Sequence, residues 1–285
     1  MMRGMFAAIS GLQVHQTMLD VAANDIANVN TVGYKGEQAS FKDALSQLQR
    51  GAAGPSTSLG GTNAVQIGLG VQLGAVQNEM EAGAIQQTGN PLDLAIQGDG
   101  MFRVGAGAVI ASGQGYSYTR AGNFTLDSAG NLVTQDGLFV IGYKYDAATD
   151  TYPVSTANET KINIPAGSKS ATVGSDGVVS YIDPAGAIVK VAQISMAKFA
   201  NINGLQRISG NLFEATNNSG AEVAAVPGDA ATGMGSIAGG CVEMSNVDLA
   251  REFTTMITAQ RGYQANSRVI SIADQMLQDL VNIGR

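Results

Sequence analysis

The sequence predicts an α+β fold: long N- and C-terminal helices pair in a coiled-coil-like domain, and a central, mainly antiparallel β domain lies between them in the chain. Two observations support this prediction. Apolar residues recur at helical spacing at both ends of the chain, whereas Asp-Gly and Gly-rich turns divide the middle into short β-type runs. The 285 residues are 45% hydrophobic and 14% charged, which is typical of a folded chain.

The N-terminal helix is expected to begin at Met2 and to end near Asn28. Apolar residues spaced three and four positions apart form one face of it, which only Gln16 interrupts. Such a face predicts pairing with another helix. The apolar residues are Met5, Ile9, Leu12, Leu19, Ala23 and Ile26.

The C-terminal helix is expected from Ser245 to Arg285. Asp248 follows Ser245 by three residues, and such a pair can cap the free N–H groups of a first helical turn. A helix of this length spans about 55 to 60 Å, so part of it should meet something outside its own domain. Two alternatives remain open, an antiparallel pair that closes one domain and a seam for self-assembly. The apolar residues that recur every seven positions are Leu249, Met256, Tyr263, Ile270 and Leu277.

The chain is expected to divide into three parts. Residues 1–30 and 245–285 form the helical domain, and residues 31–75 form an extended linker that is rich in Gly, Ser and Thr. Residues 76–244 form the β domain, in which Asp-Gly pairs predict hairpins. We expect roughly ten antiparallel strands there.

The chain offers no set of residues for catalysis, metal binding or cofactor binding. It contains one histidine, His15, and one cysteine, Cys241, whereas nucleophilic catalysis and Cys/His metal sites need several such groups close together. Asp99, Asp127 and Asp136 stand at turn positions, where aspartate is favoured for backbone reasons. The sequence therefore predicts a protein that is not an enzyme and has no cofactor.

Charge and hydropathy exclude further classes. The net charge is −7 and the basic residues are scattered, which argues against nucleic acid as a partner. No stretch approaches the roughly 18 apolar residues of a membrane span, so no membrane insertion is expected. The N-terminal apolar run is short and no small-residue cleavage site follows it, so no cleaved signal peptide is expected.

Five segments resemble the signature sequences of the bacterial flagellar rod and hook axial proteins. Their order and length make the resemblance specific, and it covers nearly the whole chain. The segments are residues 19–35 (LDVAANDIANVNTVGYK), 90–102 (NPLDLAIQGDGMF), 118–124 (YTRAGNF), 243–249 (EMSNVDL) and 256–267 (MITAQRGYQANS).

The resemblance implies a structural subunit of the flagellar hook, in a short form that lacks the outer domain. Such subunits polymerise into a hollow, flexible tube that transmits torque from rod to filament. The sequence around Asp248, residues 259–264 and the ending at 280–283 favour the hook. The length of the chain and an insertion at about residues 45–68 are also similar to the distal rod protein of the basal body, which is the alternative.

The resemblance also implies partners and a location. The subunit is expected to form a homopolymer whose terminal helices make an inner tube, with the linker bridging adjacent subunits. Expected partners are other axial proteins (the distal rod and the hook–filament junction), the hook cap and the export apparatus. The expected location is extracellular, in the hook–basal body, after type III export.

The expected assembly interface lies on the two terminal helices. Apolar residues of one helix should meet those of the other, within a subunit or across two, and polar residues should set the register between helices. The apolar set is Leu12, Leu19, Ile26, Met256, Tyr263, Ile270 and Leu277, and the polar set is Asn24, Asn28, Gln260 and Asn266.

Two rival classes of function stay open at this stage. A polysaccharide-active enzyme would need a pocket with two close carboxylates. A soluble adhesin or binding module would use the β domain alone and keep the helices as a stalk.

Overall fold

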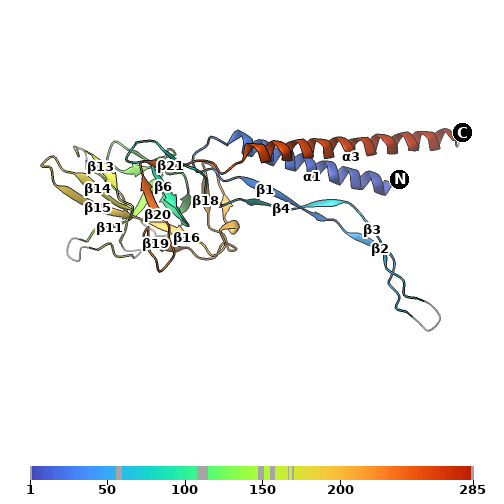
Figure 1. The fold of residues 1–285 in the computed structure, drawn as a ribbon, viewed down its shortest axis with the longest axis horizontal. Coiled ribbons are helices and arrows are strands. Elements are labelled where there is room, and N and C mark those ends of the chain that lie inside the picture. Colours follow the sequence, from blue (N-terminus) through green and yellow to red (C-terminus); the bar gives the residue numbers. More distant parts are fainter. Residues whose placement is uncertain are drawn as a thin grey trace. The chain divides into compact units, whose positions relative to one another are not determined.

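The computed structural model describes residues 2–55, 60–107, 115–146, 151–154, 158–165, 167–168 and 170–283. The chain divides into two compact units (Figure 1). The helical unit comprises Met1–Ala27, Glu37–Asn78 and Val247–Arg285, and the β unit comprises Asn28–Gly36 and Glu79–Asn246. Helices at both ends of the chain and antiparallel sheets between them confirm the predicted α+β fold.

The helical unit contains two long helices, α1 (Met2–Ala27) and α3 (Leu249–Ile283), which lie side by side (Figure 1). Gly11 lies against Asn266, and His15 lies against Gly262. Because residues later in α1 meet residues earlier in α3, the pair is antiparallel.

The start of α3 differs from the prediction, because the helix begins at Leu249 and not at Ser245. The Asp248 carboxylate accepts a hydrogen bond from the Ala250 N–H at 2.9 Å, and the Asp248 carbonyl accepts one from the Glu252 N–H at 3.0 Å. Asp248 is therefore the N-cap, and its charge also suits the positive end of the helix dipole.

Residues 37–78 form two antiparallel ladders in the helical unit. β1 (Glu37–Asp43) pairs with β4 (Val71–Asn78), and β2 (Ser46–Arg50) pairs with β3 (Val65–Gly68). The predicted linker thus consists largely of paired strands, of which β1 and β4 pack against α1. Because this segment is rich in Gly, Ser and Thr, its sequence lacks a clear alternation of apolar and polar residues, which is the pattern that predicts a strand. Residues 56–59, within the glycine-rich part, lie outside the described residues.

In the described part of the β unit, 13 strands form one sheet whose ladders are all antiparallel. Its main path runs β13 (Ala171–Val173), β14 (Val178–Ile182), β15 (Ile188–Ile194), β11 (Phe139–Lys144), β7 (Met101–Gly105), β8 (Ser117–Thr119), β18 (Leu212–Glu214) and β17 (Gln206–Arg207). Beside this path lie β9 (Thr125–Leu126), β10 (Leu132–Val133), β12 (Glu159–Lys161), β16 (Met196–Lys198) and β19 (Val223–Ala225). Smaller pairs are β5 (Ile85–Gln87) with β21 (Cys241–Glu243) and β6 (Leu94–Gln97) with β20 (Ser236–Gly239), and η2 (Ile202–Gly204) is a short 3-10 helix.

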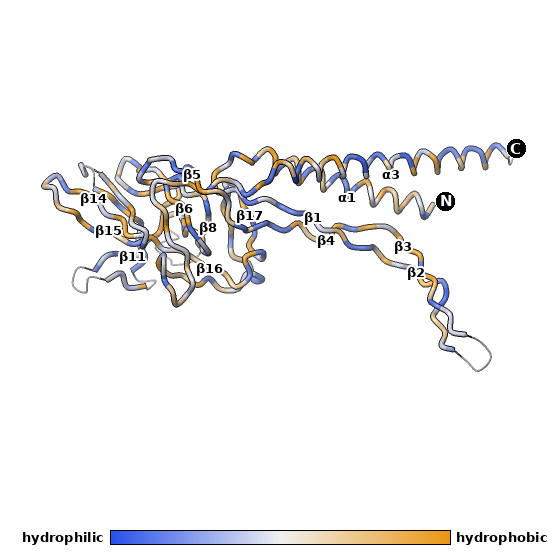
Figure 2. Tube along the Cα trace, in the orientation of Figure 1, coloured by the Kyte–Doolittle hydropathy of each residue, from blue (hydrophilic) through white to orange (hydrophobic). Residues whose placement is uncertain are grey.

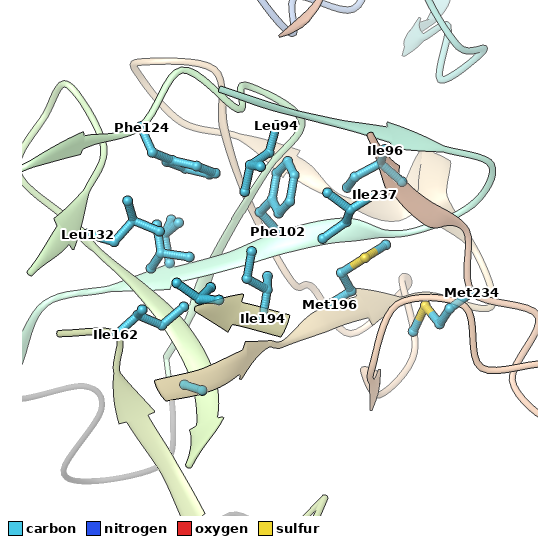
Figure 3. Packing of buried hydrophobic residues seen from close by; sticks show 14 of the residues in the cluster. Leu94, Ile96, Phe102, Phe124, Leu132, Ile162, Ile194, Met196, Met234 and Ile237 are labelled. Atoms are coloured by element: carbon cyan, nitrogen blue, oxygen red, sulfur yellow. The ribbon is translucent and has the colours of Figure 1, made fainter. Parts of the chain in front are cut away.

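Strand β7 is buried on both faces, because successive side chains of a strand point to opposite sides. Phe102 belongs to a large apolar cluster in which its ring meets the Phe124 ring edge to face, with 5.1 Å between centroids (Figure 3). Met101 belongs to a second cluster with Tyr118 and Phe199. The β unit therefore has a substantial core of its own.

Candidate assembly surface

The buried apolar residues of α1 and α3 are mostly small. On α1 the buried apolar residues are Ala8, Val14 and Ala22, and on α3 they are Ala259 and Ala273. A small side chain lets two helix backbones approach closely. The larger apolar side chains of both helices are therefore pushed to the margin of the contact or away from it.

Glycine marks the closest approach. A Cβ atom at Gly11 would lie 2.7 Å from Asn266 Nδ2, and one at Gly262 would lie 2.5 Å from the His15 ring. Either distance is shorter than real Cβ contacts, so these positions require glycine unless the facing side chain moves. Sequence reasoning missed both residues. A glycine inside a helix destabilises it by about 0.5–1 kcal/mol relative to alanine. A glycine at such a position therefore indicates a close contact, and this was the signal that could have identified both residues.

The structure separates the predicted interface residues into three groups. Half-buried positions on the two helices hold Leu12, Leu19, Ile26, Met256, Asn266, Ile270 and Leu277. Exposed positions hold Asn24, Gln260 and Tyr263. Asn28 follows the end of α1 and belongs to the β unit, where its Oδ1 accepts a hydrogen bond from the Thr31 hydroxyl at 3.1 Å.

Asn266 lies in the contact between the helices, whereas Tyr263 does not contribute a buried side chain to it. The heptad pattern predicts Tyr263 in the seam, but the tyrosine is 41% exposed. The buried Ala259 and Ala273 and the half-buried Asn266 between them follow their own seven-residue spacing. The glycine at 262 brings the helices together beside the tyrosine and leaves its ring outside.

The C-terminal half of α3 carries an exposed apolar stripe. Val269, Ile272, Met276 and Leu280 are spaced three or four positions apart, so they lie on one helical face, and each is at least 45% exposed. We call these four residues the α3 stripe. An exposed apolar stripe of this kind is a candidate surface for contact with another protein.

A similar surface occurs on α1. Met2, Phe6 and Ile9 are exposed, and their spacing puts them on a face opposite the buried Ala8 and Val14. Phe6, the largest of them, is 60% exposed. This face is a second candidate contact surface.

The two ladders of residues 37–78 have exposed apolar side chains as well. Leu45 is 78% exposed and Leu48 is 55% exposed, and all of β2 and β3 is exposed. Figure 2 shows that hydrophobic positions recur along β1, β4 and the β2–β3 extension. A two-stranded ribbon is marginally stable in water by itself, and its unpaired edges are templates for further contacts.

The β unit contains a charged network around Arg103 of β7. Arg103 Nη1 lies 2.7 Å from Glu159 Oε1, and Nη2 lies 3.0 Å from Glu222 Oε1. The hydroxyls of Tyr116 and Tyr118 donate to Glu159 and Glu222 at 2.5 and 2.6 Å. Burial raises the pKa of both tyrosines above the usual range, and the hydrogen bonds to the carboxylates act in the same direction. Each carboxylate thus pairs with Arg103 and also accepts a hydrogen bond from a tyrosine.

The described residues contain neither a candidate metal site nor a candidate membrane-spanning helix. No group of three or more His, Cys, Asp or Glu side chains there is arranged to hold a metal ion. No helix of the described chain has the length and apolarity needed to span a membrane.

Three stretches of the chain match known families. Residues 5–35 match a family described as "Flagella basal body rod protein". Residues 95–181 match "Flagellar hook protein FlgE/F/G D1 domain", and residues 238–283 match "Flagellar basal body rod FlgEFG protein C-terminal".

Whole-chain relatives carry the names of both rod and hook proteins. The chain is 46% identical over 286 residues to flagellar basal-body rod protein FlgG of Bacillus subtilis, and the alignment covers 100% of both chains. It is 37% identical to the FlgG protein of Borreliella burgdorferi, again over 100% of both chains. It is 26% identical to flagellar hook protein FlgE of the same bacterium, over 99% of this chain and 100% of that one. Within one bacterium, the rod protein is therefore more similar to this chain than the hook protein is.

Proposed function

This chain belongs to the family of bacterial flagellar rod and hook proteins, which are structural proteins and not enzymes, and we propose that it is the distal rod subunit of the flagellar basal body. The observation that carries the proposal is the end-to-end similarity to FlgG proteins, 37% identical in Borreliella burgdorferi against 26% for the hook protein there.

This proposal replaces the hook assignment that the sequence favours and adopts its alternative. The hook assignment depends on the sequence around Asp248, on residues 259–264 and on residues 280–283, which are short segments. Segments that identify a family do not separate its members, whereas identity along the whole chain weighs every position.

The exposed apolar surfaces support polymerisation as the mode of action. A subunit with separate apolar faces on α1, α3 and the β1–β4 ribbon can bind neighbours on different sides. Contacts between unlike faces, repeated with a small rotation, produce an open helical filament. In the rod, these surfaces are expected to be buried between copies of the chain.

The partners and location follow from the same proposal. The partners are further copies of the chain and the axial proteins that adjoin the rod at its two ends, with the hook at the distal one. The hook–filament junction and the hook cap, expected as partners from the sequence, belong to the hook assignment. Export without a cleaved signal peptide remains part of the proposal.

Electron microscopy of basal bodies from a strain that lacks this protein tests the proposal. We expect particles whose rod is incomplete and which carry no hook, and we expect a plasmid copy of the gene to restore both. Particles with a completed rod and no hook would overturn the proposal in favour of the hook assignment.

A further inference from the structure

Residues 28–36 follow α1 in the chain but belong to the β unit. We propose that this segment, the strap, is a conformational lock whose positioning residue is Lys35. Docked against residues 79–83 and 243–246, the strap holds together residues 36, 79 and 246, which are three of the four places where the chain enters or leaves the β unit. The inference rests on contacts inside the β unit and does not depend on the proposed function.

Backbone and amide hydrogen bonds join the three segments directly. The Gly33 N–H donates to the Glu243 carbonyl at 2.8 Å, and the Glu79 N–H donates to the Gly36 carbonyl at 2.7 Å. The Asn246 side chain accepts from the Gly36 N–H at 2.9 Å and donates to the Glu79 carbonyl at 2.7 Å. Each connection is thus bonded to the other two.

A buried charge cluster lies beneath these bonds. Lys35 Nζ is 2.6 Å from Glu243 Oε1 and also donates to the Glu81 carbonyl at 2.6 Å. The other oxygen of Glu243 is 3.2 Å from Arg120 Nη1, and the Gly83 N–H donates to Oε1 at 2.9 Å. The side chains of Lys35 and Glu243 are each 1% exposed. A charge buried this deeply is costly unless it is paired. The Lys35 ammonium group therefore favours docking of the strap only at a site where the Glu243 carboxylate can pair with it.

The charge balance makes Lys35 the replaceable member of the cluster. Two cations face one carboxylate, so Arg120 and Glu243 remain a balanced pair when the lysine is absent. Burial lowers the pKa of Lys35, against the opposing effect of Glu243. The strap is therefore held by a contact that can be broken without leaving an unpaired charge in the core.

The strap also fits its site by shape. Gly33 has a φ of +67°, and a Cβ atom there would lie 2.4 Å from the Ala121 backbone nitrogen. Tyr34 is 3% exposed, and the Arg207 guanidinium lies 4.7 Å from the centre of its ring. Glycine lets the strap approach the β unit closely, and the tyrosine anchors it there.

The connectivity of the chain gives the lock its role. The strap continues from α1, residue 79 follows β4, and Asn246 precedes α3. Tension applied along any of these elements reaches the hydrogen-bonded cluster before it reaches the core strands. A cluster of this kind should open as a unit while the rest of the β unit stays folded.

Hydrogen exchange of the full-length chain tests the inference. In the Lys35→Met variant we expect the amides of Gly33, Gly36 and Glu79 to exchange about ten- to a hundredfold faster, because a charge-assisted hydrogen bond is lost. Amides of β7 and β11 should keep their protection. Lys198→Met is the matched control. It also removes a lysine from an ion pair, but the pair of Lys198 with Asp99, at 2.9 Å, is more exposed and does not involve the strap.

Further comparisons make the outcome decisive. Glu243→Gln should disturb the β unit more than Lys35→Met does, because it leaves two buried cations without a counter-charge. Unchanged exchange in Lys35→Met, or equal acceleration of strap and core amides, would overturn the lock. If that variant does not fold, hydrogen exchange of the wild-type chain in low denaturant tests the inference. The free energy of opening should be lower for the strap amides than for the β7 amides. Equal free energies of opening would refute the inference.

Discussion

At Gly262 the backbone of α3 passes so close to α1 that a Cβ atom would lie 2.5 Å from the His15 ring. Gly11 faces Asn266 in the same way one helical turn further along. By contrast Gly4, also in α1, has no atom within 4 Å of the position its Cβ would take. Single atoms at two positions therefore decide how closely the two helices pack, whereas a third glycine is free of such a constraint.

The variant Gly262→Leu should destabilise the helix pair. The added side chain must push His15 and the α1 backbone away, at a cost of about 1–3 kcal/mol, which exceeds the gain in helix propensity. The measurement is the urea dependence of circular dichroism at 222 nm. Gly4→Leu is the control and should be neutral or stabilising. Equal stability of both variants would contradict the close contact.

The stability of the β unit should fall as the pH rises above about 10. Burial raises the pKa of Tyr118 in the folded state. A raised pKa means that the stabilisation is complete below the unfolded-state pKa and is lost progressively at higher pH, as the unfolded chain ionises first. We expect the free energy of unfolding between about pH 8 and 11 to decline less steeply in Tyr118→Phe than in the wild type. An equal or steeper decline would refute this account of the tyrosine.

At the scale of elements, α3 has two different apolar faces. Ile270 is half-buried and lies on the side of Asn266 and Ala273, which face α1. Ile272, two positions away, is 53% exposed and belongs to the α3 stripe. The same residue type therefore stabilises the single chain at one position and is available to a neighbouring molecule at the other.

Aspartate at these two positions should have separable effects. Ile270→Asp should lower the stability of the helix pair by about 1–3 kcal/mol, because it puts an unpaired charge against α1. Ile272→Asp should leave the single chain stable and raise the critical concentration for polymerisation at least about tenfold. Light scattering measures polymerisation, and circular dichroism measures stability.

The control for this pair is Gln275→Asp, which adds the same charge at a polar, exposed position of α3. It should change neither measurement appreciably. If Ile272→Asp polymerises as readily as this control, the α3 stripe is not an assembly surface.

At the scale of the whole molecule, the two units differ in what stabilises them. The β unit has a large buried core that includes Leu94, Ile96 and Phe102. In the helical unit, none of the described residues of the 37–78 ribbon is buried, and many of its apolar side chains are exposed. The β unit therefore has an extensive core of its own, whereas the helical unit leaves many apolar side chains exposed.

Deletion of residues 51–61 should therefore affect assembly and leave the β unit folded. We expect polymers of altered stiffness or stability in electron micrographs, together with an unchanged thermal transition of the β unit. Loss of that transition would mean that the deleted segment supports the β core and does not act between subunits.

Much of the fold could be predicted from the sequence, because it depends on local chemistry. The apolar spacing of residues 2–27 follows from the period of a helix, and the strands near Asp99-Gly100 and Asp136-Gly137 follow from turns that few other residues allow. The prediction that the chain is not an enzyme depends on its having one histidine and one cysteine, and the family agrees with it. The family follows from long segments in a fixed order, which the whole-chain relatives confirm.

Only the tertiary structure decided which residues face each other. Asn246 is bonded to Gly36 and Glu79, so Asp248 and not Ser245 caps α3. The seam between the helices uses glycine and alanine, since backbone approach outweighs the size of the apolar side chain. Residues 28–36 join the β unit because Lys35 meets a carboxylate that lies 208 positions away in the sequence. Helical period and turn preference act over a few residues and can be read locally, whereas burial and charge pairing depend on partners that only the folded chain brings together.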